Sequence, residues 1–388
     1  MLNKILALDG GGTWALLQAK ALRVIFDDAP GWKILSQFDL AAANSGGSIV
    51  LAGLIENKKP SEILKLFTDQ NIREGIFKRI SVIENLLAHI PIFPRYSSQG
   101  KLAGLTEALG MQGNQALAHL PELPGWPTGP GGKSVRILIT SFDYDNQHAA
   151  LFRSYKTRLG SNTDSTTLVQ AVHASSNAPV SFFDAPAEFN GRRYWDGAMA
   201  GLNNPVMAGL TDLLAEGIPA TGIAVLSIGT GTTRLLPAST PNAGAYLCEQ
   251  REKNSITGDV TKAANCILDD PPDQATYMAH IVLSAAQQNQ MQNVGPLVRL
   301  NPTITPVYDN THQVWAVPAG LSATEFQALA KLQLDAVSQE DVQLIESLGE
   351  AWINGNVPNQ PIQMHAGLSA TDIGDKTFKE GVNRWRAL

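Results

Sequence analysis

The sequence predicts an α/β fold with a mixed central sheet and helices on both of its faces. Short apolar runs of strand length alternate with stretches whose apolar residues recur at helical spacing. Two of the first runs end in clusters of small residues that lead straight into a helical pattern. The chain has 388 residues, 44% of them hydrophobic, so it can bury a core of the size that such a sheet needs.

The amino-terminal part contains two strand–loop–helix units. Lys4 to Leu8 is a short apolar run closed by Asp9 and three glycines, and residues 14–26 follow with helical spacing. Residues 38–43 predict a second buried strand, and residues 48–55 begin another helix after a turn of small residues. The α/β pattern therefore starts at the first residues of the chain.

The same alternation continues through the rest of the chain. The Pro- and Gly-rich segment 121–132 predicts a surface excursion. Together with the apolar stretch 86–93, it is expected to form a rim or lid that meets lipid. The tail after Gly355 is weakly patterned. We expect strands at 135–142, 149–155, 193–195 and 224–228, and helices at 61–87, 167–175, 273–289 and 324–352.

Composition and charge exclude several classes of protein. With 29 Lys and Arg against 35 Asp and Glu the net charge is −6, so we expect no nucleic-acid partner. Cys248 and Cys266 are too few for a disulfide framework or a four-cysteine metal site. We expect two reduced thiols, with a single bridge between them as the alternative. No signal-peptide core is seen, and the longest apolar stretch, 38–55, holds polar residues at its middle. We expect a soluble cytoplasmic protein, with a non-classical route of secretion left open.

The first candidate for chemistry is Ser45, in the run NSGGS at 44–48 between the second strand and its helix. A serine on a tight strand-to-helix turn presents its hydroxyl outward, and small neighbours let the backbone turn without clashes. The following helix points its dipole and free N–H groups toward that hydroxyl. Ser45 is therefore a candidate nucleophile. The alternative is an ordinary glycine-rich connection, and Ala43 stands where an elbow usually has its first glycine.

Two further elements carry groups that suit catalysis. Gly10, Gly11 and Gly12 follow the first strand, where their N–H groups suit a phosphate or an oxyanion. Asp196 ends the strand at 193–195 and precedes a glycine, so it is a candidate base, although Asp-Gly is also a common turn. The seven histidines show no local motif, which leaves a Ser–His pair open, and no cluster has metal-ligand spacing.

Together these elements resemble the patatin-like phospholipase family. The order is a glycine loop that begins at Asp9, a nucleophile elbow at 38–48, and an Asp-Gly-Ala element at Asp196 that leads into Asn-Asn-Pro. Residues 174–183 (ASSNAPVSFF) and 226–231 (LSIGTG) are also similar to members of that family.

The resemblance implies a three-layer α/β/α catalytic core over residues 4–232. Residues 233–388 are then expected to pack on it as a C-terminal part with sheet-completing segments, helices and the weakly patterned tail. The resemblance also implies a serine acyl hydrolase, of the lipase, esterase or phospholipase A type, that needs no cofactor and no metal. Its substrate would be a lipid or a small ester, with transient contact with a membrane or a lipid-droplet surface.

In the mechanism that the resemblance implies, Ser45 attacks the ester carbonyl and Asp196 takes the hydroxyl proton, without a histidine. The N–H groups of Gly11 and Gly12, together with Gly10, form the oxyanion hole. One departure from the family pattern bears on the substrate, because Trp14 stands where the family loop commonly has arginine. The loss of that cation favours neutral esters or glycerides over phospholipids.

Two other functions stay open. Residues 8–13 (LDGGGT) also resemble the first phosphate loop of actin-like ATPases and sugar kinases, in which Asp9 would organise a magnesium ion. Such a phosphotransferase gives no role to Ser45 or to Asp196. The second alternative keeps the fold and makes the protein a catalytically inactive lipid-binding module, motivated by the Trp14 and Ala43 departures.

Overall fold

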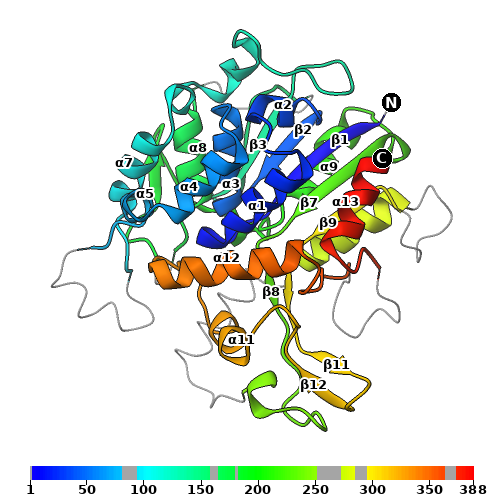
Figure 1. The fold of residues 1–388 in the computed structure, drawn as a ribbon. Coiled ribbons are helices and arrows are strands. Elements are labelled where there is room, and N and C mark those ends of the chain that lie inside the picture. The colour runs from blue at the N-terminus through cyan, green and yellow to red at the C-terminus, as the bar shows by residue number, and fades with distance from the viewer. Residues whose placement is uncertain are drawn as a thin grey trace.

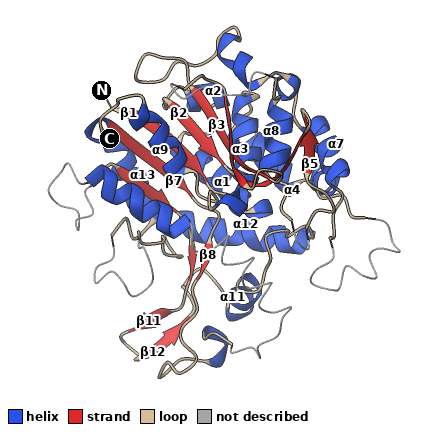
Figure 2. Cartoon of the chain, turned by 180° about the vertical axis from the view of Figure 1, so that it is seen from behind, coloured by secondary structure: helices blue, strands red, loops and turns tan. Residues whose placement is uncertain are grey.

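A computed structural model of the chain describes residues 2–80, 94–157, 165–179, 182–250, 272–284, 295–362 and 373–388. A mixed sheet of eight strands forms the middle of the molecule, and helices cover both of its faces (Figure 1 and Figure 2). The protein has a three-layer α/β/α fold, which confirms the fold class predicted from the sequence.

Parallel strands form the centre of the sheet. The order across it is β5-β6-β3-β2-β1-β7-β9, and β4 also pairs with β3. The parallel strands are β1 (Asn3–Leu8), β2 (Leu40–Ala43), β3 (Arg136–Asp143), β7 (Ile223–Ile228) and β9 (Leu297–Leu300). The antiparallel strands are β4 (His148–Arg153), β5 (Ala187–Phe189) and β6 (Arg192–Asp196). Two small ribbons lie outside this sheet: β8 (Thr232–Thr233) with β10 (Thr303–Ile304), and β11 (Val307–Asp309) with β12 (Val314–Ala316).

Helices supply the outer layers. The α-helices are α1 (Leu16–Ile25), α2 (Gly31–Leu35), α3 (Ser45–Ile55), α4 (Pro60–Thr68), α5 (Gln70–Ile76), α7 (Ser98–Ala108), α8 (Leu168–Ser175), α9 (Val206–Ala215), a helix at 272–284, α11 (Ala323–Leu329), α12 (Gln339–Ile353) and α13 (Phe378–Ala387). Short 3-10 turns occur at Gly12–Ala15 (η1), Met111–Asn114 (η2), Leu117–Glu122 (η3), Gly197–Ala200 (η4), Ala220–Gly222 (η5) and Ala245–Leu247 (η6). No helix in the described ranges combines the length and the apolar composition that a membrane crossing needs.

The sheet is buried on both faces because successive side chains of its central strand point in opposite directions. Leu6 and Leu8 of β1 pack into a core that includes residues of α1, α3 and α12. Ile5 and Ala7 of the same strand pack into a second core, with residues of α9 and the helix at 272–284. A strand at the centre of the sheet, such as β1, therefore needs apolar residues at successive positions, because both of its faces are buried.

The expected strands and most expected helices are present, with differences in the C-terminal part. The helix expected at 324–352 is divided into α11 and α12, because Ser338 caps a new helix by accepting from the N–H of Asp341. The tail ends in α13, which opens with a capping box of Thr377 and Glu380. Phe378, Val382 and Trp385 lie on one face of it and are buried.

Some expectations fall beyond the described part of the chain. The expected helix at 61–87 is α4 and α5 as far as Ile76, and the one at 273–289 is helical as far as residue 284. The remainder of both helices, and Cys266, lie outside the described residues, whereas Cys248 is a buried free thiol. The division into a core at 4–232 and a C-terminal part stays a prediction.

A buried ion pair ties the C-terminal part to the first strand. Arg299 of β9 donates from Nη2 to Asp9 Oδ2 at 2.6 Å and from Nη1 to Ser227 Oγ at 2.8 Å. Both charged side chains are 3% exposed. Burial raises the pKa of Asp9 to about 6, because the cost of desolvating the carboxylate outweighs the attraction of Arg299.

The ion pair leads to a stability prediction. Arg299→Met leaves the Asp9 carboxylate buried without its cation, so we expect the free energy of unfolding at pH 8 to fall by about 3–5 kcal/mol in urea titrations. The loss should be smaller at pH 5, below the folded pKa of Asp9, because the carboxyl can then fold in its protonated form. Adding Asp9→Asn should recover much of the loss at pH 8. Equal losses in the single and double variants would contradict this role of the pair.

Candidate active site

The carboxyl ends of the parallel strands bring the predicted site residues to one edge of the sheet. Leu8 of β1 pairs with Ala43 of β2 and with Ile228 of β7, so the segments that follow these residues start at the same level. The antiparallel strand β6 runs in the opposite direction. Its last residue, Asp196, pairs with Ser141 of β3. Ala43 of β2 pairs with Ile139 of the same strand, two residues before Ser141. The register thus brings Asp196 to the turn that follows β2.

Ser45 is the first residue of α3 and has a left-handed backbone, with φ at +49°. This conformation is strained for any residue other than glycine. The N–H of Ser45 donates to Ser175 Oγ at 2.9 Å, and its carbonyl accepts from Ser48 Oγ at 2.6 Å. These two bonds hold the strand-to-helix turn expected from the sequence.

The carboxylate of Asp196 is completely buried and surrounded by donors. Its Oδ1 accepts from Asn44 Nδ2 at 3.0 Å and from the N–H of Ala198 at 2.9 Å. Ser45 lines the same cavity as this carboxylate, and its side chain is one of the groups that lower the pKa of Asp196. Burial raises the pKa of Asp196 above its ordinary value, and the hydrogen bonds from Ala198 and Asn44, together with the nearby Ser45 side chain, reverse part of that rise.

Asn44 orients the carboxylate. The Oδ1 atom of Asn44 accepts from Thr140 Oγ1 at 2.8 Å, which turns its amide group toward Asp196. The same amide lies 3.3 Å from Asn203 Oδ1. The sequence motifs contain Asn44 and Asn203 but assign neither a role, because their contacts join residues more than 90 positions apart.

The glycine loop packs directly against the serine turn. A Cβ atom on Gly10 would lie 2.9 Å from Ser45 Cβ, and one on Gly12, whose φ is +54°, would lie 2.4 Å from the carbonyl oxygen of Leu334. The N–H of Gly10 donates to the carbonyl of Asn203 at 2.8 Å, so it is not the free oxyanion donor that we predicted. The N–H groups of Gly11 and Gly12 have no hydrogen-bond partner in the part of the chain that the structure describes.

A small cavity, of about 40 Å³, joins these elements. Ser45, Asp196, Gly11 and Gly12 line it. Much of the remaining wall is apolar, and one cation, Lys101, lies among these residues. The other lining residues are Gly46, Ile49, Phe77, Ser176, Ala178, Phe182, Phe183, Asn203, Leu334 and Asp335.

The comparison with known families decides the assignment. The sequence model of the family described as patatin-like phospholipase matches residues 6–210, more than half of the chain. The chain belongs to the patatin-like phospholipase family. Membership in this family supports a lipid hydrolase function. No curated protein sequence matches the chain.

Solved structures show only distant similarity to this patatin-like chain. VipD from Legionella pneumophila is 12% identical, with a TM-score of 0.38, over 90% of this chain and 67% of VipD. ExoU from Pseudomonas aeruginosa, solved in complex with SpcU, is 13% identical, with a TM-score of 0.29, over 74% of this chain. The chain spans 51% of ExoU. The family assignment rests on the sequence match, because these TM-scores are too low to add to it.

Two features of the surroundings bear on the expectations from the sequence, and the second of them corrects one. Trp14, which takes the place of the family's loop arginine, is not among the lining residues, and its ring N–H donates to the carbonyl of Gln333 at 3.1 Å. The excursion at 121–132 lies at the other end of the sheet, where Gly131 donates to Asp39 Oδ1 at 2.6 Å just before β2. It therefore forms no rim of this cavity, and the stretch 86–93 lies outside the described residues.

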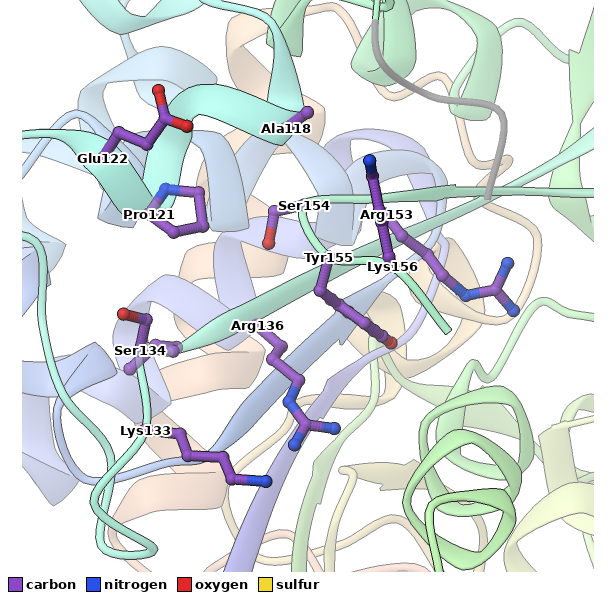
Figure 3. Close-up of a pocket in the computed structure, with 11 residues that line it drawn as sticks. Ala118, Pro121, Glu122, Lys133, Ser134, Arg136, Arg153, Ser154, Tyr155 and Lys156 are labelled. Atoms are coloured by element: carbon purple, nitrogen blue, oxygen red, sulfur yellow. The ribbon is translucent and has the colours of Figure 1, made fainter. Parts of the chain in front are cut away.

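A second cavity lies at that opposite end, between the start of β3 and the end of β4 (Figure 3). Arg136 pairs with Glu216 at 2.7 Å, just after α9. Arg153 pairs with Asp212 of α9, also at 2.7 Å. Both arginines are therefore neutralised within the fold, where they join the sheet to α9. The basic residues that line the cavity are Lys133, Arg136, Arg153 and Lys156.

No described histidine lines the candidate active-site cavity of this patatin-like protein. His173 contacts Ser98 at 3.1 Å, and burial, helped by the charge of Lys101, lowers its pKa to about 3. His89 and His365 lie outside the described residues. Within the described ranges, no group of three His, Cys, Asp or Glu side chains is arranged to hold a metal ion. Asp9, the magnesium ligand of the kinase alternative, binds Arg299 instead.

The left-handed turn gives a prediction about stability. We expect Ser45→Gly to be more stable than Ser45→Ala by about 1 kcal/mol in urea unfolding, because glycine adopts a positive φ without strain. Ser48 of the same helix is the control. There, glycine should be less stable than alanine by about 1 kcal/mol. The same order at both positions would contradict a strained turn at Ser45.

Proposed function

We propose that the protein is a serine acyl hydrolase that cleaves carboxylic esters of lipids through an acyl-enzyme on Ser45. The observation that carries this proposal is that Ser45 and the buried carboxylate of Asp196 line one cavity, with the serine side chain near enough to lower the pKa of that carboxylate. The family match supports hydrolase chemistry on lipids. The cavity supports it further, because it holds both side chains beside a loop with two N–H groups that have no partner among the described residues.

The proposed reaction uses one base twice. Ser45 Oγ attacks the carbonyl carbon of the ester while Asp196 accepts the hydroxyl proton. The tetrahedral intermediate collapses, and the leaving alcohol takes that proton from Asp196. A water molecule then gives a proton to Asp196 as its oxygen attacks the acyl group, and Ser45 regains a proton as it leaves. An aspartate near its reference pKa of about 3.9 is a weak base, so the raised pKa of Asp196 favours this role.

The proposed oxyanion hole consists of the N–H groups of Gly11 and Gly12. Removing one donor from such a site costs on the order of 3 kcal/mol of transition-state stabilisation. Gly10 takes a different part, because its bond to the Asn203 carbonyl braces the loop against the segment that follows Asp196. In this proposal Gly10 holds the loop in place, whereas Gly11 and Gly12 donate hydrogen bonds to the oxyanion.

The walls of the cavity suit the acyl chain of a lipid. Phe77, Phe182 and Phe183 contribute aromatic rings, and Ile49 and Leu334 add aliphatic surface. We propose a lipase, esterase or phospholipase A of the carboxylic ester hydrolase class, acting in the cytoplasm. It would touch membrane or lipid-droplet surfaces transiently, and its catalytic core at 4–232 would be completed by the C-terminal part.

Replacing the nucleophile tests the acyl-enzyme. Ser45→Ala should lower the rate of p-nitrophenyl ester hydrolysis by at least about 10³-fold and abolish labelling by a fluorophosphonate probe. The melting temperature should stay near that of the unsubstituted protein, because only one hydroxyl is lost. Labelling that survives the substitution would identify another serine as the nucleophile. A panel of ester chain lengths beside a defined phospholipid then measures substrate preference.

Replacing the base tests the dyad. Asp196→Asn should lower kcat by about 10²–10⁴-fold with the fold intact, because an amide cannot accept the serine proton. The control is Asp145→Asn, which removes an exposed carboxylate that pairs with Arg193 of β6, and it should keep the activity. Near-normal turnover by the Asp196→Asn variant would point to a different base.

A further inference from the structure

Lys101 of α7 is a buried cation beside the proposed dyad. Its side chain is 1% exposed, and its Nζ donates to the carbonyl of Ser176 and lies 4.1 Å from the centre of the Phe183 ring. An ammonium group has three donors, and the other two have no acceptor among the described residues. Burying such a charge costs several kcal/mol unless an opposite charge is near.

The end of α8 brings this cation close to Asp196. Two consecutive carbonyls at this helix end bind Lys101 and Asp196. The carbonyl of Ser176 accepts from Lys101 Nζ, and the carbonyl of Asn177 accepts from the N–H of Asp196 at 3.0 Å. Lys101 and Asp196 also line the same cavity. A helix C-terminus favours a cation, which adds to the attraction.

Other charged groups around Lys101 have partners of their own. Asp335, the second carboxylate of the cavity wall, pairs with Arg95 at 3.0 Å and accepts from Tyr96 at 2.7 Å. His173, which faces Lys101 from α8, is neutral at physiological pH because its pKa is lowered to about 3. Among the described residues of the cavity wall, Asp196 is therefore the carboxylate whose charge Lys101 can balance.

We propose that Lys101 is a positioning residue whose ammonium group keeps the buried Asp196 carboxylate ionised, and so ready to accept the Ser45 proton. This role rests on the proposed function, in which Asp196 is the base. Asp196 loses its charge when it is protonated, and the oxyanion carries that charge instead, so the cation stays balanced through the attack. Lys101 thus acts through Asp196 and forms no bond to the substrate.

The proposal predicts how the effect of Lys101 on the rate depends on pH. Burial raises the pKa of Asp196 and lowers the pKa of Lys101 to about 7, and each opposite charge reverses part of these shifts. At acid and neutral pH the ammonium holds the carboxylate in its charged form. At alkaline pH Lys101 is itself neutral and Asp196 is ionised without help. Loss of Lys101 should therefore matter at low pH and lose its effect at high pH.

The test is the pH profile of kcat/KM on a soluble p-nitrophenyl ester. In Lys101→Met and Lys101→Gln the apparent pKa of the acid limb should rise by at least about one pH unit. At a pH below that pKa, kcat/KM should then be about tenfold lower than in the unsubstituted protein. Above pH 8 the rates should converge with those of the unsubstituted protein. Lys101→Gln keeps a donor for the Ser176 carbonyl, and Lys101→Arg should restore the acid limb because it keeps the charge. Lys78→Met, which removes a nearby exposed lysine, should leave the profile unchanged.

Two outcomes would overturn the proposal. A rate loss of equal size at every pH would mean that Lys101 is only structural, and an unmoved acid limb would mean that its charge does not act on the base. The titration of Asp196 can also be followed directly by carbon-13 NMR of labelled aspartate, with Asp196→Asn to assign the signal. An unchanged titration in Lys101→Met refutes the positioning role alone, whereas turnover by Asp196→Asn refutes the dyad and the role that rests on it.

Discussion

A fully buried carboxylate must be met by donors, and the polar structure of this site follows from that requirement at Asp196. Asn44 and Ala198 supply hydrogen bonds at 3.0 Å and 2.9 Å. They come from the turn after β2 and the turn after β6, so the carboxylate is satisfied only when these strands reach the same edge of the sheet. The strained backbone of Ser45 persists because this edge holds it from several sides.

The C-terminal part contributes to a site whose sequence motifs all precede it. Arg299 neutralises Asp9 beneath the glycine loop, and the carbonyl of Leu334 accepts from the N–H of Thr13 at 3.1 Å. Leu334 and Asp335 also line the cavity. These residues lie beyond the segment matched by the family model, 6–210, so part of the cavity wall is built from sequence outside that segment.

Features that depend on adjacent residues were predictable. The turn at Ser45 and the glycine loop after β1 need small residues at fixed positions, and the sequence places them there. Asp196 was found through the family resemblance, since Asp-Gly by itself also indicates a turn. The expectations that failed concern where a segment packs: the excursion at 121–132 lies at the far end of the sheet, and the N–H of Gly10 is taken by Asn203.

The sequence by itself determined the α/β class, the strand–turn–helix at Ser45 and the loop of small residues, because strand periodicity and glycine-dependent turns are local properties of the chain. Only the tertiary structure decided that Lys101 lies buried in the wall of the cavity that Asp196 also lines, and that Asn44 turns its amide toward the carboxylate. Nothing in the sequence near Lys101 distinguishes it from a solvated surface lysine. The physical reason is that the environment of a charge depends on which distant segments enclose it, and packing sets that environment.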